Sequence, residues 1–322
     1  MSGSLQLAPL LRRYGTFLGF LLIVSFFWTQ RPDTFMTTRN WLNITQQVSI
    51  VCVISFTMTL VMVGGDFDLS VGSMASFSGM IAAVLWQQDV SLFGALGTAV
   101  LVGTFGGVFN GVLVAYAGLS AFVATLGTLT IFSGLALLVS NGKTRFGRAL
   151  PDLGGGFSRG GLPLAEGIQL PNLTLIAILV LILMGIVLQH TVFGRNLHAV
   201  GGNREASLLA GVPVARLRLI AFAVNGAGAA IAGLMLVSRL SSANPTQGDG
   251  LMLNAIASVF VGMTMSEEGE PNLFGTLTGV LILGVLSHGL TQLRIDTYVQ
   301  QILTGLIIIA AVLFSRLTLR KR

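Results

Sequence analysis

The chain has 322 residues, of which 53% are hydrophobic and 9% are charged, and its formal net charge is +6. Because a soluble domain carries roughly 25% charged residues, this composition excludes an ordinary soluble protein, a disordered chain and a coiled coil. The single cysteine, Cys52, excludes a disulfide-rich secreted fold. Basic residues stand one or two at a time and form no basic face, so we expect no nucleic-acid partner. The composition indicates a protein embedded in membrane lipid.

Ten apolar segments approach the length of a membrane-spanning helix, which is about 20 residues. They are 14–30, 42–63, 70–86, 91–117, 120–140, 172–189, 217–237, 251–265, 273–291 and 298–315. Segment 70–86 is rich in Gly and Ser and segment 251–265 is short, as is typical of broken or re-entrant helices beside a cavity. We therefore predict an all-α polytopic membrane protein, a single transmembrane domain over residues 1–322 with about ten helices, eight full and two short or broken.

Basic residues near the chain ends bear on the orientation. The first apolar segment follows Arg12 and Arg13, and no small-residue cleavage site follows it, so we interpret it as the first span with a cytoplasmic N-terminus. Ten spans then place both termini in the cytoplasm, with ten basic residues on the inner side and eight on the outer side. This small excess favours the assignment. It places segment 193–218 in the cytoplasm and segment 141–172 in the periplasm.

The 41 glycines include several at the spacing of close helix contacts. Gly103, Gly107 and Gly111 form two overlapping GxxxG units, and Gly275 and Gly279 form another. Small residues let helix backbones approach closely in lipid. The pattern predicts packing within one helical bundle in preference to a dedicated dimer interface.

The connection 64–73 places two carboxylates, Asp66 and Asp68, among glycines next to an apolar segment. Such charges must be paired or hydrated. Asp68 or Ser70 can cap the helix that follows, and this is the interpretation that the pattern favours. The alternative is that Asp66 is a proton-relay or substrate group.

The polar segment 193–218 contains a short amphipathic helix with defined ends. Asn203 can cap its N-terminus, and Gly211 ends it. Leu208 and Leu209 give it an apolar patch, which suits insertion into a groove on another protein. The alternative is a surface connector, which would need neither the patch nor the defined ends.

The segment 141–172 is rich in Gly and Pro and is long for a mere connection. On the outer side of the membrane it could dock a partner or cover a pore mouth. We predict one of these two roles for it.

Catalytic and cofactor motifs are missing from the sequence. His190, His198 and His288 are scattered without metal-ligand spacing. A Gly-Lys-Thr triplet occurs at 142–144, but Leu137 stands where a phosphate-binding loop needs its first glycine. We therefore predict no catalytic residue, no metal site and no cofactor, and ATP would have to be bound by another polypeptide.

Polar residues within the apolar segments are candidates for a solute pathway, which needs weak polar contacts so that the solute is released. Each is equally well explained as an interhelical hydrogen bond. Together with the two carboxylates and the serine of the 64–73 connection, the candidates are Asp66, Asp68, Ser70, Asn110, Thr125, Asn225, Asn254 and Ser287.

Several strings in order along the chain resemble the ribose/arabinose-type (simple sugar) ABC transporter permeases. GDFDLSVGS at 65–73 is similar to the family signature (S/G)G-(I/F)-DLSVGS, and FVATLGT at 122–128 also matches. FGR at 193–195 with GGNREAS at 201–207, and RLSSANP at 239–245, continue the similarity, which runs from about residue 40 to residue 315. The chain departs from the family in the loop 262–271, where Glu267, Glu268 and Glu270 replace glycines.

This resemblance implies the ABC importer permease fold and a sugar-transport subunit in the bacterial inner membrane. It implies as partners two cytoplasmic ABC ATPase domains that bind ATP and Mg²⁺, a periplasmic sugar-binding protein, and a second permease copy, identical or related. The helix within 201–211 would be the coupling helix held by the ATPases. Its coupling residues would be Gly201, Gly202, Asn203, Arg204, Glu205, Ala206, Leu208, Leu209 and Gly211.

Two other functions remain open at this stage. A branched-chain amino acid ABC permease would share the same broad architecture. An ion-coupled secondary transporter would use Asp66 and Asp68 as coupling carboxylates. A membrane-embedded enzyme is disfavoured, because His, Cys and acidic residues do not cluster in the sequence.

Overall fold

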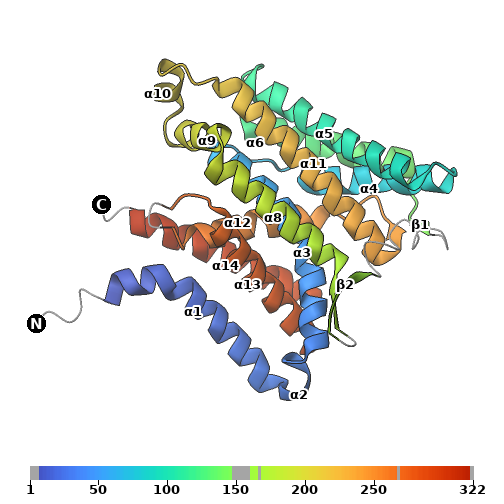
Figure 1. The fold of residues 1–322 in the computed structure, drawn as a ribbon, viewed down its shortest axis with the longest axis vertical. Helices are drawn as coiled ribbons and strands as arrows, with labels where there is room; N and C mark the ends of the chain where they lie inside the picture. The colour runs from blue at the N-terminus through green and yellow to red at the C-terminus, as the bar shows by residue number, and fades with distance from the viewer. Residues whose placement is uncertain (1–6, 147–159, 166–167, 267–268, 320–322) are drawn as a thin grey trace, which may run out of the picture. The chain divides into compact units, whose positions relative to one another are not determined.

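The computed structural model describes residues 7–146, 160–165, 168–266 and 269–319 (Figure 1). The chain divides into two compact units. Unit 1 comprises Met1–Val48 and Asn254–Arg322, and unit 2 comprises Ser49–Leu253.

Helices dominate both units. They are α1 (Leu7–Gln30), α2 (Pro32–Phe35), α3 (Thr38–Val63), α4 (Val71–Gln87), α5 (Leu92–Ala115), α6 (Ala121–Ser140), α8 (Asn172–His190), α9 (Val192–Gly202), α10 (Arg204–Leu209), α11 (Val214–Leu240), α12 (Asp249–Met263), α13 (Leu273–Gln292) and α14 (Thr297–Leu319). Each of the ten predicted spans coincides with one of these helices. The prediction of a helical polytopic fold is confirmed.

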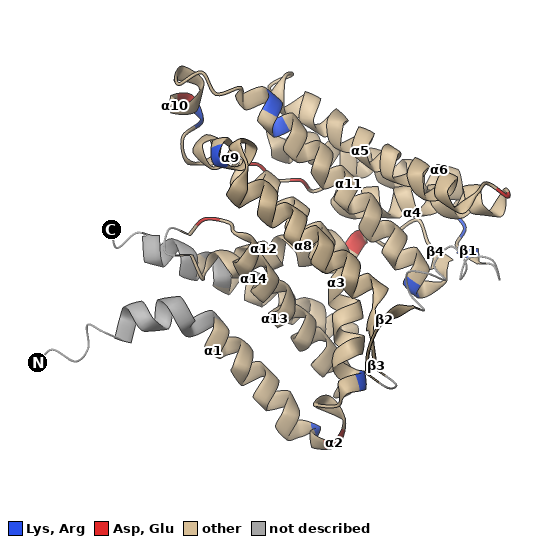
Figure 2. Ribbon diagram, in the orientation of Figure 1, with Lys and Arg blue, Asp and Glu red and all other residues tan. Residues whose placement is uncertain are grey.

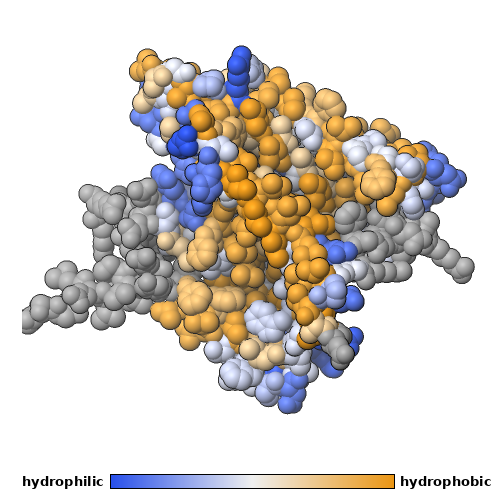
Figure 3. All heavy atoms as spheres, viewed as in Figure 1, coloured by the Kyte–Doolittle hydropathy of each residue, from blue (hydrophilic) through white to orange (hydrophobic). Residues whose placement is uncertain are grey.

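Among the described residues, six helices are long and apolar enough to cross a membrane: α3, α5, α6, α8, α11 and α13. The described residues also contain three shorter apolar helices: Phe17–Gln30 within α1, α4 and α12. Charged residues gather near helix ends and in the connections (Figure 2), and much of the visible surface is hydrophobic (Figure 3). Phe105 of α5 and Leu138 of α6 leave 68% and 70% of their surface exposed, which suits contact with lipid.

In unit 2, α11 packs against α4 and α5, and α4 also packs against α6. The α5 glycines make the closest of these contacts possible. A Cβ added at Gly107 would overlap the Phe222 carbonyl oxygen of α11, and one at Gly111 would lie 2.8 Å from the Leu219 Cα. The predicted role of the GxxxG units in internal packing is therefore confirmed.

We expect Gly107→Ala to lower the free energy of unfolding by about 1–3 kcal/mol, because the added methyl group forces α5 away from α11. Gly97→Ala, on the same helix, is the matched control, since its Cβ would meet no atom within 4 Å. It should be neutral or should stabilise by about 0.5–1 kcal/mol, because Ala is the better helix former. Unfolding of the detergent-solubilised variants measures both values. Equal destabilisation by the two substitutions would contradict this account of the α5–α11 contact.

In unit 1, the second predicted glycine pair also packs internally. A Cβ added at Gly275 of α13 would overlap the backbone of Gly262 of α12, and one at Gly279 would overlap the backbone of Ser258. His288 of α13 lies near the start of α3, with its Nε2 atom 2.8 Å from the Asn40 Oδ1 atom.

Short strands occur in the connections, so the all-α prediction holds for the spans but not for every loop. β1 (Arg145–Phe146) pairs with β4 (Ser242–Ala243), and β2 (Gly161–Ala165) pairs with β3 (Ile168–Pro171), both antiparallel. The predicted outer loop 141–172 therefore contains a hairpin, while its residues 147–159 and 166–167 lie outside the described residues.

The acidic loop between α12 and α13 is described only in part. Glu267 and Glu268 lie outside the described residues, and Glu270 is exposed.

Candidate functional site

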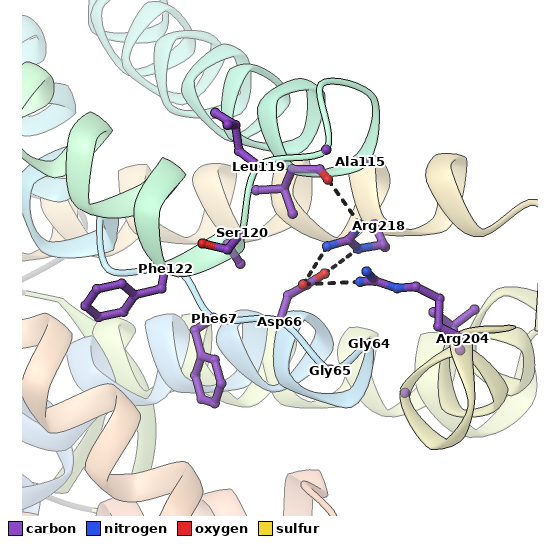
Figure 4. A pocket seen from close by; sticks show the side chains of 15 residues that line it. Gly64, Gly65, Asp66, Phe67, Ala115, Leu119, Ser120, Phe122, Arg204 and Arg218 are labelled. Carbon is purple, nitrogen blue, oxygen red and sulfur yellow. Dashed lines mark hydrogen bonds and ion pairs between the residues drawn. The ribbon is translucent and has the colours of Figure 1, made fainter.

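A pocket of about 690 Å³ opens in unit 2 where several connections meet (Figure 4). Its walls come from the α3–α4 connection, the α5–α6 connection, the end of α9, the start of α10 and the first turns of α11. The lining residues are Gly64, Gly65, Asp66, Phe67, Val114, Ala115, Gly118, Leu119, Ser120, Ala121, Phe122, Val200, Gly201, Arg204 and Arg218.

Two of the lining residues, Asp66 and Arg218, form a buried ion pair. Arg218 of α11 donates from Nε to Asp66 Oδ2 and from Nη2 to Asp66 Oδ1, each at 2.6 Å. Its Nη1 atom donates to the Val114 carbonyl oxygen of α5 at 3.1 Å. Asp66 is 6% exposed and Arg218 is 7% exposed. This two-point geometry satisfies both charges where they are largely removed from water.

Arg204, the first residue of α10, forms a second and longer ion pair with the Asp66 carboxylate. Its Nη2 atom lies 3.5 Å from Asp66 Oδ1, and its side chain is 46% exposed. A contact of this length and exposure is much weaker than the Arg218 pair. Figure 4 shows both guanidinium groups directed toward Asp66 from different helices.

The end of α9 packs directly on the connection that carries Asp66. A Cβ added at Gly201 would overlap the Val63 carbonyl oxygen, and one at Gly64 would lie 3.0 Å from Leu197 Cδ1. Gly65 has φ +81°, a conformation that favours glycine because it has no Cβ. Glycine at these positions permits the close approach of the two backbones.

Asp68 is the centre of a second buried network. Its Oδ1 atom accepts hydrogen bonds from the Ser70 backbone N–H at 2.9 Å and hydroxyl at 2.6 Å, and a long one from Asn110 Nδ2 at 3.5 Å. Its Oδ2 atom accepts from Asn225 Nδ2 at 3.0 Å, and the Thr57 hydroxyl donates to Asn225 Oδ1 at 3.1 Å. The network joins α3, α5 and α11 to the α3–α4 connection.

The N-terminus of α4 agrees with the cap interpretation only in position, because the Ser70 side chain accepts no hydrogen bond from the helix and donates to Asp68 instead. Ser70 is its N-cap residue, and the Asp68 carboxylate accepts the Ser70 N–H. Burial raises the pKa of Asp68, and the hydrogen bonds from Ser70, Asn225 and Asn110 each lower it. These donors offset the removal of the carboxylate from water.

The structure brings together five of the eight pathway candidates: Asp66, Asp68, Ser70, Asn110 and Asn225. Asn110 Nδ2 also donates to the Ser70 hydroxyl at 2.8 Å. All five are buried. Four of them, Asp68, Ser70, Asn110 and Asn225, are hydrogen-bonded to one another, as the packing alternative predicts, whereas Asp66 pairs with Arg218.

Thr125, Asn254 and Ser287 are not in this cluster. The buried Thr125 hydroxyl donates to the Ala121 carbonyl oxygen of its own helix at 2.7 Å. In unit 1, the Asn254 carbonyl oxygen accepts from the Ser258 hydroxyl, and the Ser287 hydroxyl donates to Gln300 Oε1 at 3.0 Å.

We expect Asn225→Ala to destabilise the protein by about 1.5–3 kcal/mol, since a buried carboxylate loses a donor. Thr125→Val should lower stability by about 1 kcal/mol or less, because only a bond within one helix is lost. Thermal unfolding of the two variants compares them. A larger loss for Thr125→Val would contradict the assignment of Asp68 as the centre of the network.

The α10 helix has the ends that the sequence predicts. The Asn203 Oδ1 atom accepts from the Ala206 N–H at 2.9 Å, and Gly211 follows the helix with φ +78°. Leu208 is 57% exposed, Leu209 is 87% exposed, and Glu205 is also exposed. The predicted cap, stop and exposed apolar patch are therefore confirmed.

Sequence reasoning missed the role of Arg218, which it counted only as an inner-side base. The sequence does carry one signal for this role. Arg218 lies near the start of a long apolar helix, where a charged side chain requires a partner. The partner could not be identified from spacing, because Asp66 and Arg218 are 152 residues apart in the chain.

Comparison with known proteins gives matches to transport permeases over nearly the whole chain. Residues 40–312 match the model of a family described as the permease component of branched-chain amino acid transport systems. The ribose import permease of Bacillus subtilis is 35% identical over 95% of this chain and 93% of that protein. The D-allose transport system permease of Escherichia coli is 34% identical over 95% and 92%, and the L-arabinose ABC transporter permease of Azospirillum brasilense is 35% identical over 95% and 88%.

Proposed function

The chain belongs to the permease family of ABC importers that includes the ribose, allose and arabinose permeases, and we propose that it forms the translocation pathway of a bacterial importer for a monosaccharide. The observation that carries this proposal is the identity of about a third over nearly the whole length of these relatives. The protein is thus a multi-pass transport subunit and not an enzyme. It carries no cofactor, and ATP is handled by a partner ATPase.

The α10 helix is the coupling helix in this proposal. Its exposed Leu208 and Leu209 would enter a groove on an ATPase domain, with Asn203 and Glu205 at the edge of the contact. Gly201, Gly202, Ala206 and Gly211 would shape the backbone around it. Burial of an exposed leucine stabilises a contact by about 1.5–3 kcal/mol, so the patch is sufficient for an anchor. ATP-driven closure of the ATPase pair would then move α10 and alternate the access of the pathway.

The orientation proposed from the sequence gains support from the length of α8. This helix joins the β2–β3 hairpin to α9, and its 19 residues rise about 28 Å. The hydrocarbon core of a bilayer is about 30 Å thick. The hairpin and α10 therefore suit opposite faces of the membrane, and the orientation proposed from the basic residues puts the hairpin on the periplasmic one.

The partners follow from this orientation. We propose that two ATPase domains bind on the cytoplasmic side with both chain termini, that a binding protein delivers the sugar on the periplasmic side, and that a second permease copy completes the pathway. That copy is identical or related. All residues of the chain form one transmembrane permease domain in this proposal.

The test is a ligand screen on the binding protein encoded beside this permease, followed by uptake into proteoliposomes that contain all subunits. We expect binding and ATP-dependent uptake of a pentose or hexose such as ribose, arabinose or allose. Uptake of leucine or valine instead would support the branched-chain amino acid alternative. Uptake that an uncoupler abolishes would support ion coupling through Asp66 and Asp68.

A further inference from the structure

We propose that Arg204 acts inward: it transmits the movement of α10 to the membrane helices by sharing the Asp66 carboxylate with Arg218. The α3–α4 connection, residues 64–70, is the element that receives this movement. The inference rests on the proposed role of α10 as the coupling helix.

The first step is the direct contact between α9 and this connection. Gly201, three residues before Arg204, packs so closely on Val63 and Gly65 that a Cβ there would overlap the Val63 carbonyl oxygen. A displacement of the α9–α10 corner therefore acts on the connection at once. Close packing transmits such displacements because protein interiors are nearly incompressible.

The second step is the difference between the two arginines. Arg218 is buried, binds both carboxylate oxygens of Asp66 at 2.6 Å and holds the Val114 carbonyl oxygen. Arg204 is half exposed and lies 3.5 Å from one oxygen. Arg218 is thus a fixed anchor on α11 and α5, whereas Arg204 can tighten or release as α10 moves.

The third step leads from Asp66 to the interior of unit 2. Asp68, two residues further along the connection, is hydrogen-bonded to Asn110 of α5 and Asn225 of α11. Both carboxylates of the connection are therefore tied to the same pair of helices. A displacement of the connection therefore acts on α5 and α11 through two sets of contacts, those of Arg218 and those of Asp68.

The surface of α10 separates two roles. Leu208, Leu209 and Glu205 are exposed and free to contact an ATPase, while the Arg204 guanidinium turns toward Asp66 in the pocket (Figure 4). Arg204 is accordingly a positioning residue of the coupling machinery, and the leucines supply the binding surface.

A double-mutant cycle tests this inference in the assembled transporter, with Arg204→Gln, Asp66→Asn and the double variant. We expect Arg204→Gln to lower the sugar transported per ATP hydrolysed by roughly two- to fivefold, the range of a half-exposed ion pair. ATPase co-purification should stay unchanged. In the Asp66→Asn background, Arg204→Gln should have no further effect, because the shared partner is gone.

Two further Arg204 variants and one control variant keep the test decisive if Asp66→Asn fails to fold. Arg204→Glu, which repels the native Asp66, should lower the coupling ratio more than Arg204→Gln, and Arg204→Lys should restore most of it. Arg195→Gln replaces another exposed arginine, on α9, and should change nothing. Loss of ATPase co-purification in Arg204→Gln, or additive effects in the cycle, would overturn the inference. Failure of the proposed function would look different, because the native protein itself would then bind no ATPase.

Discussion

Arg218→Ala should lower the free energy of unfolding by about 3–5 kcal/mol, because it leaves the buried Asp66 carboxylate with only the weak contact to Arg204. The two 2.6 Å contacts and the bond to the Val114 carbonyl oxygen would all be lost. Denaturant unfolding of the detergent-solubilised protein, followed by circular dichroism, measures the change. A loss this large should also reduce the amount of folded protein in the membrane.

Two controls identify the cause of that loss. Arg216→Ala removes an exposed arginine from the same turn of α11 and should change stability by less than about 0.5 kcal/mol. Asp66→Leu combined with Arg218→Met removes both charges and should recover most of the stability, since a buried pair can be replaced by apolar residues at little cost. Equal stability of Arg218→Ala and Arg216→Ala would contradict the ion-pair account.

Leu208→Asp combined with Leu209→Asp should abolish binding of the ATPase subunit and ATP-driven transport. Each leucine contributes about 1.5–3 kcal/mol when it is buried in a groove, and an aspartate there would add an unpaired charge. Stability should change little, because both side chains are exposed on the free permease. Co-purification of the ATPase and uptake by proteoliposomes measure the two losses.

Leu164→Asp is the matched control for the coupling helix. Leu164 lies on β2 and is 59% exposed, close to the exposure of Leu208. In the proposed orientation it faces the periplasm, so its replacement should leave ATPase binding intact. If Leu164→Asp released the ATPase and the α10 variant retained it, the proposed orientation would be wrong.

The sequence was sufficient for features that depend on local chemistry. Hydropathy located ten helices, because lipid requires continuous apolar helices, and six of those among the described residues are long and apolar enough to cross a membrane. Asn203 and Gly211 identified the ends of α10, because a side-chain cap and a positive φ depend on residue type alone. The glycine spacing on α5 likewise indicated a close helix contact.

Features that depend on distant partners could not be predicted. A proton-relay or substrate role for Asp66 stays open as an alternative at the level of sequence, because nothing local indicates that Arg218 neutralises it. Polarity alone grouped Asn254 and Ser287 with Asn225, although only Asn225 joins the Asp68 network. The β2–β3 hairpin was missed because its strands are short and contain Gly and Pro, which sequence patterns associate with loops.

The central claim is that this permease moves its solute only with energy supplied by a separate ATPase through α10. The most direct measurement is sugar uptake by proteoliposomes that contain the permease and binding protein, with the ATPase subunits either present or omitted. The account predicts uptake with the ATPase and ATP, and none above background when either is left out. Accumulation of the sugar against its gradient without the ATPase would contradict it.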